Sequence, residues 1–308
     1  MRIHTSFESV VNVVNPVVTI GTFDGVHLGH ISIINKISEI AKEIGGETVL
    51  LTFYPHPRMV LHPEDHQIKL LHTPEEKARR LEEVGIDHLV IYPFSKEFSR
   101  LSPFEYVRDL IVTGLHAHTV AVGYDHRFGR NREGDHLGLV ELSETFGFQV
   151  EEIPAKMIDS NNVSSTKIRS ALESGLIREA TQFLGYRYSL TGKVIKGDGI
   201  GRTFGYPTAN IEVNYPYKLI PANGIYAVET VVKGKPFRGV ASIGVRPTIN
   251  DKNLRSVEVF IFDFNEDIYG ESIQMTFVDY IRPEMKFGSI DELKRNIAND
   301  IIKAKQLF

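Results

Sequence analysis

The sequence contains no cysteine among its 308 residues, which excludes disulfide bonds and thiolate-ligated metal sites. No apolar stretch approaches the ~20 residues that a membrane-spanning helix requires. The start of the chain, Met1–Thr5, lacks the long apolar segment of a secretory signal peptide. The formal net charge is only −4, so we expect no general attraction to nucleic acids or anionic membranes. These absences favour a cytoplasmic protein with neither a nucleic-acid nor a membrane partner.

The length and composition favour two folded domains. A chain of 308 residues exceeds the usual size of one domain, and its hydrophobic content of 42% is ample for two cores. We find no internal repeat and no low-complexity tract. The function must therefore be sought in local motifs.

The first half of the chain alternates strand-like and helix-like patterns, which is typical of a parallel sheet covered by helices on both faces. The expected strands are Val17–Ile20, Thr48–Phe53, His88–Ile91, Thr119–Gly123 and Gln149–Ile153. The expected helices are Ile31–Glu43, Pro74–Val84, Pro103–Val112 and Leu137–Phe146. In such sheets ligands bind at the carboxyl ends of the strands, where the strand order reverses.

After Leu184 the pattern changes to strand-like runs separated by glycine and proline, which predicts an antiparallel barrel or sandwich. The expected strands are Tyr188–Ile195, Gly224–Val232, Phe237–Ile243, Val257–Phe262 and Ser272–Tyr280. A last amphipathic helix is expected from the capping residue Ser289 to about Gln306. We therefore predict two domains, residues 1–184 and 185–308.

The segment Gly21–His30, with the sequence GTFDGVHLGH, joins a predicted strand to a predicted helix. Free N–H groups and the positive end of the dipole at a helix N-terminus attract phosphate. His27 and His30 stand at this helix start, where imidazoles can donate hydrogen bonds to phosphate oxygens. Surface histidines on an ordinary helix cap are the alternative, and it would be preferred for an isolated pair. The strand, the glycines and both histidines together favour a phosphate site.

Three further segments lie where ligands are expected. Gly123–Arg130 is a charged loop directly after a predicted strand, and a solvated loop is an equally good interpretation. Val163–Arg169 begins a helix with three hydroxyl residues and two cations, which can surround phosphate, although Ser and Thr are also ordinary helix caps. Thr52–Pro57 closes the second strand, and its prolines can simply fix a rigid turn, so His56 is as readily structural as ligand-binding.

These four segments resemble the motifs of nucleotidylyltransferases, and in particular those of the prokaryotic FAD synthetases. Their GxFDGxHxGH, GxDFxFG, ISSTxIR and TFxPHP motifs are similar to Gly21–His30, Gly123–Gly129, Val163–Arg169 and Thr52–Pro57, with His126 in place of a Phe. The resemblance implies that His27, His30 and Arg169 are catalytic. It implies nucleotide contacts for Gly21, Phe23, Asp24, Gly25, Gly29, Asp125, Ser164, Ser165 and Thr166, and flavin contacts for His56 and Pro57.

The strongest motif of the second half is the loop Gly197–Asn210, in which four glycines fall within nine residues. Such a loop lets backbone N–H groups approach a phosphate closely. Thr208 and Asn210 add neutral oxygen atoms that suit a hard cation such as Mg²⁺. A glycine-rich turn of a barrel is the alternative, and glycine content by itself would favour it.

Glu258 is an acidic residue within the apolar strand Val257–Phe262. The ordinary explanation is that Glu258 faces solvent, because alternate residues of a strand point to opposite sides of the sheet. A carboxylate within hydrogen-bond reach of a substrate hydroxyl can instead act as a general base during phosphoryl transfer.

The second half resembles the riboflavin kinases, whose PTAN motif is similar to Pro207–Asn210. Gly239–Thr248 resembles their GVxNIGxRPT segment with Ser242 for Asn, and Ile281–Phe287 resembles LRxExKF with a departure at Pro283. The resemblance implies that Glu258 is the general base, although Phe260 replaces a frequent His. It implies nucleotide contacts for Gly197, Gly199, Gly201, Arg202, Gly205 and Pro207, a metal held with ATP by Thr208 and Asn210, and flavin contacts for Arg282 and Phe287.

The resemblance therefore extends over both halves and implies a bifunctional riboflavin kinase/FAD synthetase. The fold class would be α/β, a Rossmann-like nucleotidylyltransferase domain followed by an antiparallel β-barrel kinase domain with a C-terminal helix. The expected ligands are ATP with Mg²⁺, riboflavin, FMN and FAD, and the expected state is a monomer or a weak homo-oligomer. Two alternatives stay open, a chain with one active domain and a flavin or nucleotide sensor without turnover.

Overall fold

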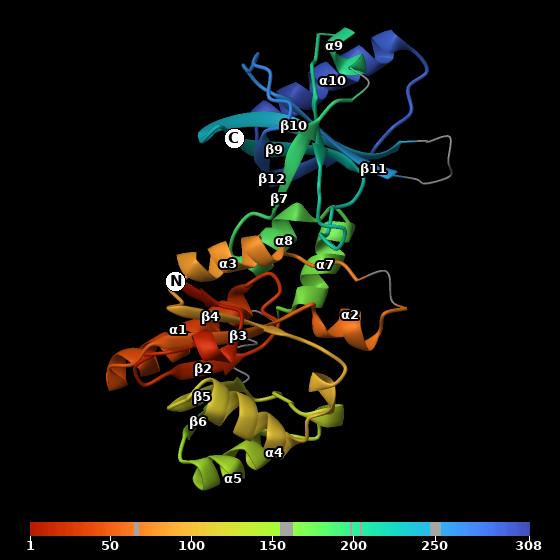
Figure 1. The fold of residues 1–308 in the computed structure, drawn as a ribbon. Helices are drawn as coiled ribbons and strands as arrows, with labels where there is room; N and C mark the ends of the chain where they lie inside the picture. Colours follow the sequence, from red (N-terminus) through yellow and green to blue (C-terminus); the bar gives the residue numbers. More distant parts are fainter. Residues whose placement is uncertain (65–67, 155–162, 198, 204, 247–253) are drawn as a thin grey trace. The chain divides into compact units, whose positions relative to one another are not determined.

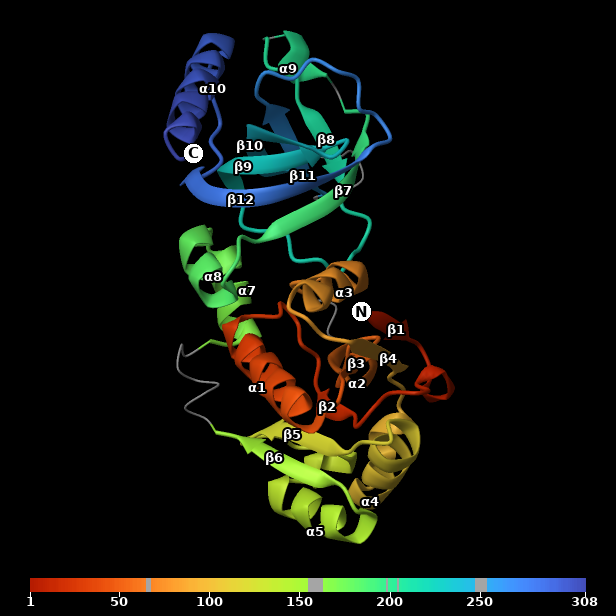
Figure 2. The same ribbon diagram turned by 90° about the vertical axis from the view of Figure 1, so that its left-hand side faces the viewer.

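The computed structural model describes residues 1–64, 68–154, 163–197, 199–203, 205–246 and 254–308. These residues form two compact units, Met1–Ser165 and Thr166–Phe308, traced from red to blue in Figures 1 and 2. Parts of two predicted motifs lie outside the described residues, namely Asp198 and Phe204 of the glycine-rich loop and Pro247–Thr248 of the segment 239–248.

The first unit contains a six-stranded parallel sheet in the order β1-β4-β3-β2-β5-β6, which confirms the predicted fold class. Its strands are β1 (Arg2–His4), β2 (Val17–Ile20), β3 (Thr48–Tyr54), β4 (His88–Pro93), β5 (Thr119–Gly123) and β6 (Gln149–Ile153). The sequence did not predict β1, because it is only three residues long and its one buried side chain is a histidine, His4.

Helices cover both faces of this sheet, because successive residues of the strands point to opposite sides. Val18, Val49 and Leu51 contribute to one core, while Val17 and Leu50 contribute to the other. The first core is covered by α4 (Pro103–Tyr106), the π-helical η3 (Val107–Gly114) and α5 (His136–Phe146). The second is covered by α1 (Leu28–Ile44) and α3 (Pro74–Glu83). Short helical turns are η1 (Phe7–Ser9), α2 (Pro57–Leu61), η2 (Phe98–Arg100) and η4 (Arg130–Arg132).

The strand order reverses between β2 and β5, because β3 and β4 follow on one side of β2 whereas β5 and β6 lie on the other. Ligands of open α/β sheets bind outside the carboxyl ends of the strands at such a point. The segment Gly21–His30 directly follows β2, and Gly123–Arg130 follows β5. The topology therefore places two of the predicted motifs at the expected position.

The second unit contains a closed barrel in the order β10-β11-β8-β7-β12-β9, which decides between the predicted barrel and sandwich. Its strands are β7 (Ser189–Ile195), β8 (Ala209–Glu212), β9 (Gly224–Val232), β10 (Lys235–Arg246), β11 (Leu254–Ile261) and β12 (Ser272–Arg282). The four-residue strand β8 was not predicted, because it follows directly on the glycine-rich loop. The short helix α9 (Ile200–Thr203) lies within that loop.

The helix α10 (Ile290–Lys305) begins as predicted at Ser289, whose hydroxyl accepts a hydrogen bond from the backbone N–H of Glu292 at 3.2 Å. Along β11, Val257 and Val259 are buried, while Glu258 and Phe260 are half-buried on the other side of the strand. Phe260 belongs to a cluster with Ile301 of α10, so α10 packs on this outer face of the barrel.

The helices α7 (Ser165–Glu173) and α8 (Ile177–Leu184) precede the barrel. The carbonyl of Leu172 accepts a hydrogen bond from the N–H of Ala222 at 2.9 Å, and Arg178 pairs with Asp279 of β12 at 2.6 Å. These contacts place nearly all of both helices in the compact unit Thr166–Phe308. The functional boundary at 184/185 stays a prediction, which separately expressed domains can test.

Within the described residues, no helix combines the length and the apolar character that crossing a bilayer requires.

Candidate active sites

The turn after β2 has a strained backbone. Phe23 and Val26 adopt left-handed conformations with φ of +45° and +36°, and both side chains are buried. A positive φ is unusual for any residue with a side chain and is an outlier for a β-branched one such as Val26. Gly25, between them, has φ of +87°. Strain of this kind persists only where the surrounding structure holds it, and it is concentrated at functional sites.

His27 and His30 cap the N-terminus of α1 reciprocally. The Nδ1 atom of His27 accepts from the N–H of His30 at 3.4 Å, and the Nδ1 atom of His30 accepts from the N–H of His27 at 3.3 Å. An Nδ1 atom that accepts a hydrogen bond carries no proton, so each neutral ring holds its proton on Nε2. The two rings stack with centroids 3.7 Å apart. The capping arrangement therefore makes both rings Nε2–H donors.

The surroundings of His30 keep its ring neutral. Burial lowers the pKa of His30 well below its ordinary value, and the nearby His27, Lys77 and His72 lower it further. At neutral pH the site therefore offers hydrogen-bond donors without a charged imidazole on His30.

Asp24, predicted to contact nucleotide, holds the neighbouring backbone in this structure. Its side chain is buried, and both carboxylate oxygens accept from the N–H of Leu71 at 3.0 Å. One of them also accepts from the N–H of His72 at 3.2 Å. Asp24 thereby fixes the segment before α3 against the turn, and its contact with nucleotide stays a prediction.

Sequence analysis missed Lys77, which α3 brings to the same turn. Its Nζ atom donates to the carbonyl oxygen of Thr22 at 2.7 Å and contacts the Oγ1 atom of Thr52 at 3.4 Å. The pattern of this helix did not predict a role for Lys77, because a lysine on a charged amphipathic helix is expected to face solvent. Only the position of α3 over the sheet shows where this side chain goes.

The start of α7 also meets this turn. The hydroxyl of Ser165 donates to the carbonyl oxygen of Asp24 at 2.8 Å, so the predicted hydroxyl-rich segment reaches the motif after β2. Ser164 precedes the helix and Thr166 follows Ser165 within it. Arg169 is half-buried and lies four residues, or about one turn, further along α7.

The loop after β5 presents Asp125 to solvent. His126, in the place of the aromatic residue that the motif predicts, stacks on Phe128 with ring centroids 5.9 Å apart. Burial lowers the pKa of His126 to about 4, so its ring is neutral at neutral pH. His126 thus fills the aromatic position as an uncharged ring, which preserves packing in the loop.

After β3, His56 caps the short helix α2, because its Nδ1 atom accepts from the N–H of Arg58 at 3.2 Å. Pro57 occupies the first turn of that helix. The structure therefore gives His56 a local structural role, and flavin contact for His56 and Pro57 stays a prediction.

In the second unit, Glu258 lies beside the predicted metal-binding residues. Its Oε2 atom accepts from the Oγ1 atom of Thr208 at 3.0 Å. In the register of the barrel, Glu258 on β11 is directly opposite Asn210 on β8 and Ser242 on β10. A Cβ atom on Gly197 would collide with the side chain of Asn210, so that close approach requires glycine.

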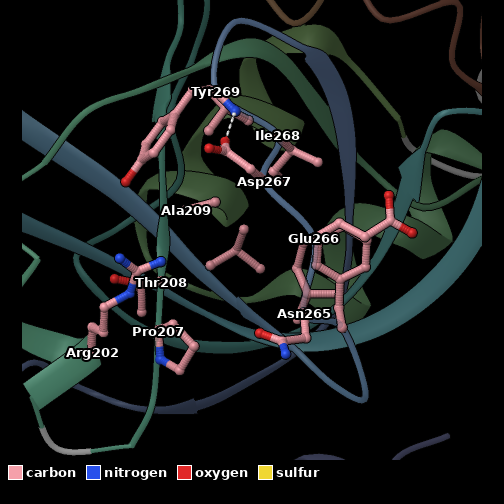
Figure 3. Close-up of a pocket in the computed structure, with 13 residues that line it drawn as sticks. Arg202, Pro207, Thr208, Ala209, Asn265, Glu266, Asp267, Ile268 and Tyr269 are labelled. Carbon is pink, nitrogen blue, oxygen red and sulfur yellow. Dashed lines mark hydrogen bonds between the residues drawn. The ribbon is translucent and has the colours of Figure 1, made fainter.

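Thr208 lines two cavities. One has a volume of about 310 Å³ and lies between Arg202, Pro207 and Thr208 on one side and residues 265–269 on the other (Figure 3). The second, of about 360 Å³, lies between the barrel and α10 and is lined by Glu258, with apolar side chains such as Phe260 and Ile301. Val259 and Ile261 line the first cavity, so it lies on the other face of β11 from Glu258, and Thr208 is the residue that both cavities share.

Arg282 lines the second cavity but is engaged with α10. Its Nη2 and Nε atoms donate to the carboxylate of the buried Asp300 at 2.7 and 2.9 Å, and its guanidinium lies 5.6 Å from the ring centre of Phe287. Two parallel N–H···O bonds fix a guanidinium firmly. Sequence analysis missed Asp300, since an acid in an amphipathic helix reads as exposed. The pair attaches α10 to the strand that leads into Phe287.

Comparison with known proteins gives a consistent result over both units. A family model of FAD synthetase matches residues 12–167, and a family model of riboflavin kinase matches residues 184–308. Proteins named bifunctional riboflavin kinase/FMN adenylyltransferase are similar over nearly the whole chain. The one from Listeria monocytogenes is 40% identical over 96% of this chain and 93% of its own length. Those from Bacillus subtilis and Escherichia coli K12 are 37% and 36% identical, each over 95% of this chain and 92% of their own lengths.

A solved structure from Streptococcus pneumoniae is also similar, with a TM-score of 0.88 and 30% identity over 98% of both chains. It is named a macrolide-efflux protein, which differs from the activities that the sequence relatives carry in their names. The likeness covers both units, so that protein shares the fold and the order of the two domains. The domain models and the sequence relatives therefore decide the family.

Proposed function

Because the chain belongs to the family of bifunctional riboflavin kinase/FMN adenylyltransferases, it makes FMN from riboflavin and FAD from FMN, and we propose how its residues divide these reactions. FMN is the product of the kinase step and a substrate of the adenylyl-transfer step, and FAD is the final product. Residues 1–184, which include Arg169, would transfer the adenylyl group, and residues 185–308, which include the barrel, would transfer the γ-phosphoryl group of ATP.

For adenylyl transfer, the paired donors of His27 and His30 are the observation that carries the proposal. The FMN phosphate oxygen attacks the α-phosphorus of ATP, the bond to the bridging oxygen breaks, and pyrophosphate leaves. Two Nε2–H groups at a helix N-terminus can donate to phosphate oxygens as negative charge builds up there. No covalent intermediate on the protein is needed, because positioning and charge stabilisation can supply most of the rate enhancement.

Arg169 and the hydroxyl groups at the start of α7 would bind the β- and γ-phosphates that leave as pyrophosphate. A guanidinium binds phosphate oxygens in a bidentate manner, and the helix N-terminus adds N–H donors. The hydrogen bond from Ser165 to Asp24 supports the role of Ser165, because it holds this residue against the turn that carries the two histidines.

Arg169→Ala is expected to raise the KM for ATP in FAD synthesis and to lower its kcat, because the leaving pyrophosphate loses a bidentate partner. Arg169→Lys keeps the charge without the fork and should fall between Ala and the wild type. Steady-state kinetics of FAD formation from FMN at varied ATP measure both variants. An unchanged ATP dependence in Arg169→Ala would mean that the guanidinium is only a charge on the helix surface.

For riboflavin phosphorylation, we propose that Glu258 takes the proton of the ribityl hydroxyl as that oxygen attacks the γ-phosphorus of ATP. The apolar cavity beneath α10 suits the flavin ring, with Arg282 and Phe287 at its margin. The cavity lined by Arg202 and Pro207 suits the nucleotide. Thr208 lines both cavities and donates to the carboxylate of Glu258, so we place phosphoryl transfer beside this pair.

Thr208 and Asn210 fit a magnesium ion that arrives with ATP. Their side chains offer neutral oxygen atoms beside one carboxylate, and Mg²⁺ is usually bound by few protein ligands together with phosphate oxygens. Among the described residues, no group of three or more His, Asp or Glu side chains could hold a metal without such help. When bound, the ion would neutralise part of the phosphate charge, while Thr208 and Asn210 orient it.

The remaining partners follow from the reactions. ATP, riboflavin, FMN and FAD are the ligands, and we propose a cytoplasmic enzyme because ATP is supplied there. The net charge of −4 supports the absence of a nucleic-acid partner. A monomer or weak homo-oligomer stays the prediction for the assembly.

Chromatography of the products from riboflavin, ATP and Mg²⁺ tests the proposed function. We expect FMN to appear first, followed by FAD with pyrophosphate. Accumulation of FMN without FAD, even when FMN is supplied, would favour a chain with one active domain. Flavin binding without any consumption of ATP would favour a sensor.

Separately expressed fragments test the division between the domains. Residues 166–308 and residues 185–308 should both convert riboflavin to FMN, but the shorter one should be less stable. It lacks α8, whose Ile177 and Leu184 are almost completely buried, and each such side chain contributes about 1.5–3 kcal/mol. Denaturant unfolding compares the stabilities of the two fragments. A folded but inactive 166–308 fragment would show that the kinase site needs residues of the first unit.

A further inference from the structure

Lys77 joins the carboxyl ends of two neighbouring strands at the adenylyl-transfer site. Its ammonium donates to the carbonyl oxygen of Thr22, just after β2, and approaches the hydroxyl of Thr52 near the end of β3. That hydroxyl also donates to Thr22 at 3.2 Å. The start of α3 fixes the approach, because Thr73 and Glu76 form a capping box one turn before the ammonium group.

A buried ammonium group at this position lowers the stability of the fold unless its charge is compensated. Burial lowers the pKa of Lys77, and the nearby carboxylate of Asp24 opposes this effect. Thr22 and Thr52 accept two of the three N–H groups of the ammonium, and the described residues offer no acceptor for the third. Placing a charge in protein with incomplete hydrogen bonding is unfavourable. A methionine would fill the same volume without that cost.

We propose that Lys77 is a positioning residue for adenylyl transfer, which holds the strained turn Phe23–Val26 through the Thr22 carbonyl and supplies positive charge near His30. This inference rests on the proposed role of the two histidines. The tether and the charge have different consequences. Loss of the tether loosens the turn, whereas loss of the charge changes the proton affinity of the imidazoles.

The charge has a defined effect on His30. The groups that face this ring are His27 on the same turn, His72 before α3, and Lys77 on α3, with the carboxylate of Asp24 close to Lys77. Positive charge on Lys77 disfavours protonation of His30, so its removal raises the pKa of His30. A second proton on that ring would go to Nδ1 and would break the hydrogen bond from His27 N–H. Activity that needs the neutral, capped ring would therefore be lost at a higher pH without Lys77.

The experiment compares Lys77→Met, Lys77→Gln and Lys77→Arg in the full-length chain. Gln keeps a donor for Thr22 without charge, and Arg keeps the charge. FAD formation from FMN is measured from about pH 5 to about pH 8, where a histidine titrates. We expect Lys77→Met and Lys77→Gln to lower kcat about tenfold or more, which is a smaller loss than the ~10²–10³-fold expected when a direct hydrogen-bond donor is removed. We also expect both substitutions to move the acid limb of the pH–rate profile to higher pH. Arg should restore the limb and most of the rate.

Riboflavin phosphorylation by the same proteins reports the amount of intact barrel, because none of these residues belongs to it, and thermal unfolding reports whether the first unit is folded. A wild-type rate and acid limb in both Met and Gln would overturn the inference. Equal slowing in all three variants with an unmoved limb would also overturn it, since that pattern indicates packing alone. His30→Ala, measured alongside, distinguishes failure of the proposed function from failure of the inference about Lys77. A normal rate in that variant would remove the proposed function itself, whereas a slow one with normal Lys77 variants removes only this inference.

Discussion

His27→Ala and His30→Ala are each expected to lower the rate of FAD synthesis by ~10²–10³ while leaving riboflavin phosphorylation unchanged. Each substitution removes one Nε2–H donor from the phosphate-binding end of α1. The two rings accept from each other's backbone N–H groups, so each Ala variant also loses part of the helix cap. Loss of a cap costs about 1 kcal/mol of stability, which is small beside the expected loss of rate.

A matched variant separates the cap from the donor. His27→Asn keeps a side-chain oxygen that can accept from the N–H of His30, because asparagine is among the preferred N-cap residues. It has no group at the position of the imidazole Nε2. We therefore expect near wild-type stability in thermal unfolding, with a loss of FAD synthesis close to that of His27→Ala. Adenylylation of FMN at the wild-type rate by any of these variants would show that the residue has no part in catalysis.

The sequence predicted the position of this site because its strands and motifs are local. The apolar run Val17–Ile20 and the following glycine turn define the end of β2 without reference to the rest of the chain. The same is true of Thr119–Gly123 and its charged loop. The observed order of the strands then brings both ends to the point where ligands bind in such sheets.

Several parts of the site could not be predicted, because they depend on contacts between distant segments. Asp24 reads as a ligand-binding residue in its motif, yet its carboxylate accepts from backbone groups 47 and 48 residues away. Lys77 and Asp300 read as solvent-facing charges on amphipathic helices, because periodicity shows which face is polar but not what that face meets. Tertiary packing decides both cases.

Glu258 is a further residue whose role could not be predicted from the local pattern of its strand. Alternation correctly predicts that it points away from the barrel core, and this is the ordinary position of a solvated carboxylate. The structure adds that α10 and the segment before it cover this outer face and enclose a cavity of about 360 Å³. Whether an outward-facing residue meets water or a substrate is thus set by a helix more than 30 residues later in the chain.

Glu258→Gln is expected to lower riboflavin phosphorylation by ~10²–10⁴ while leaving FMN adenylylation nearly unchanged. Glutamine keeps the shape of the side chain and an oxygen that can accept from Thr208, but it cannot take a proton. Substitution of an exposed acid on a strand changes stability by about 0.5 kcal/mol at most, so the two interpretations of Glu258 differ by orders of magnitude in rate at equal folding. Initial rates of FMN formation from riboflavin and ATP measure the effect.

Two controls make this test specific for proton transfer. Glu212→Gln neutralises an exposed carboxylate at the end of β8 and should leave both activities unchanged. Thr208→Ala removes the partner of Glu258 and a proposed metal contact, so its defect should be partly relieved by more Mg²⁺, whereas that of Glu258→Gln should not. The carboxylate accepts from Thr208, which lines both cavities, so near bound ATP its negative charge would be unfavourable unless it accepts a proton or helps to hold a cation. Normal phosphorylation by Glu258→Gln would therefore exclude the base and leave positioning of the two substrates as the mechanism of the barrel.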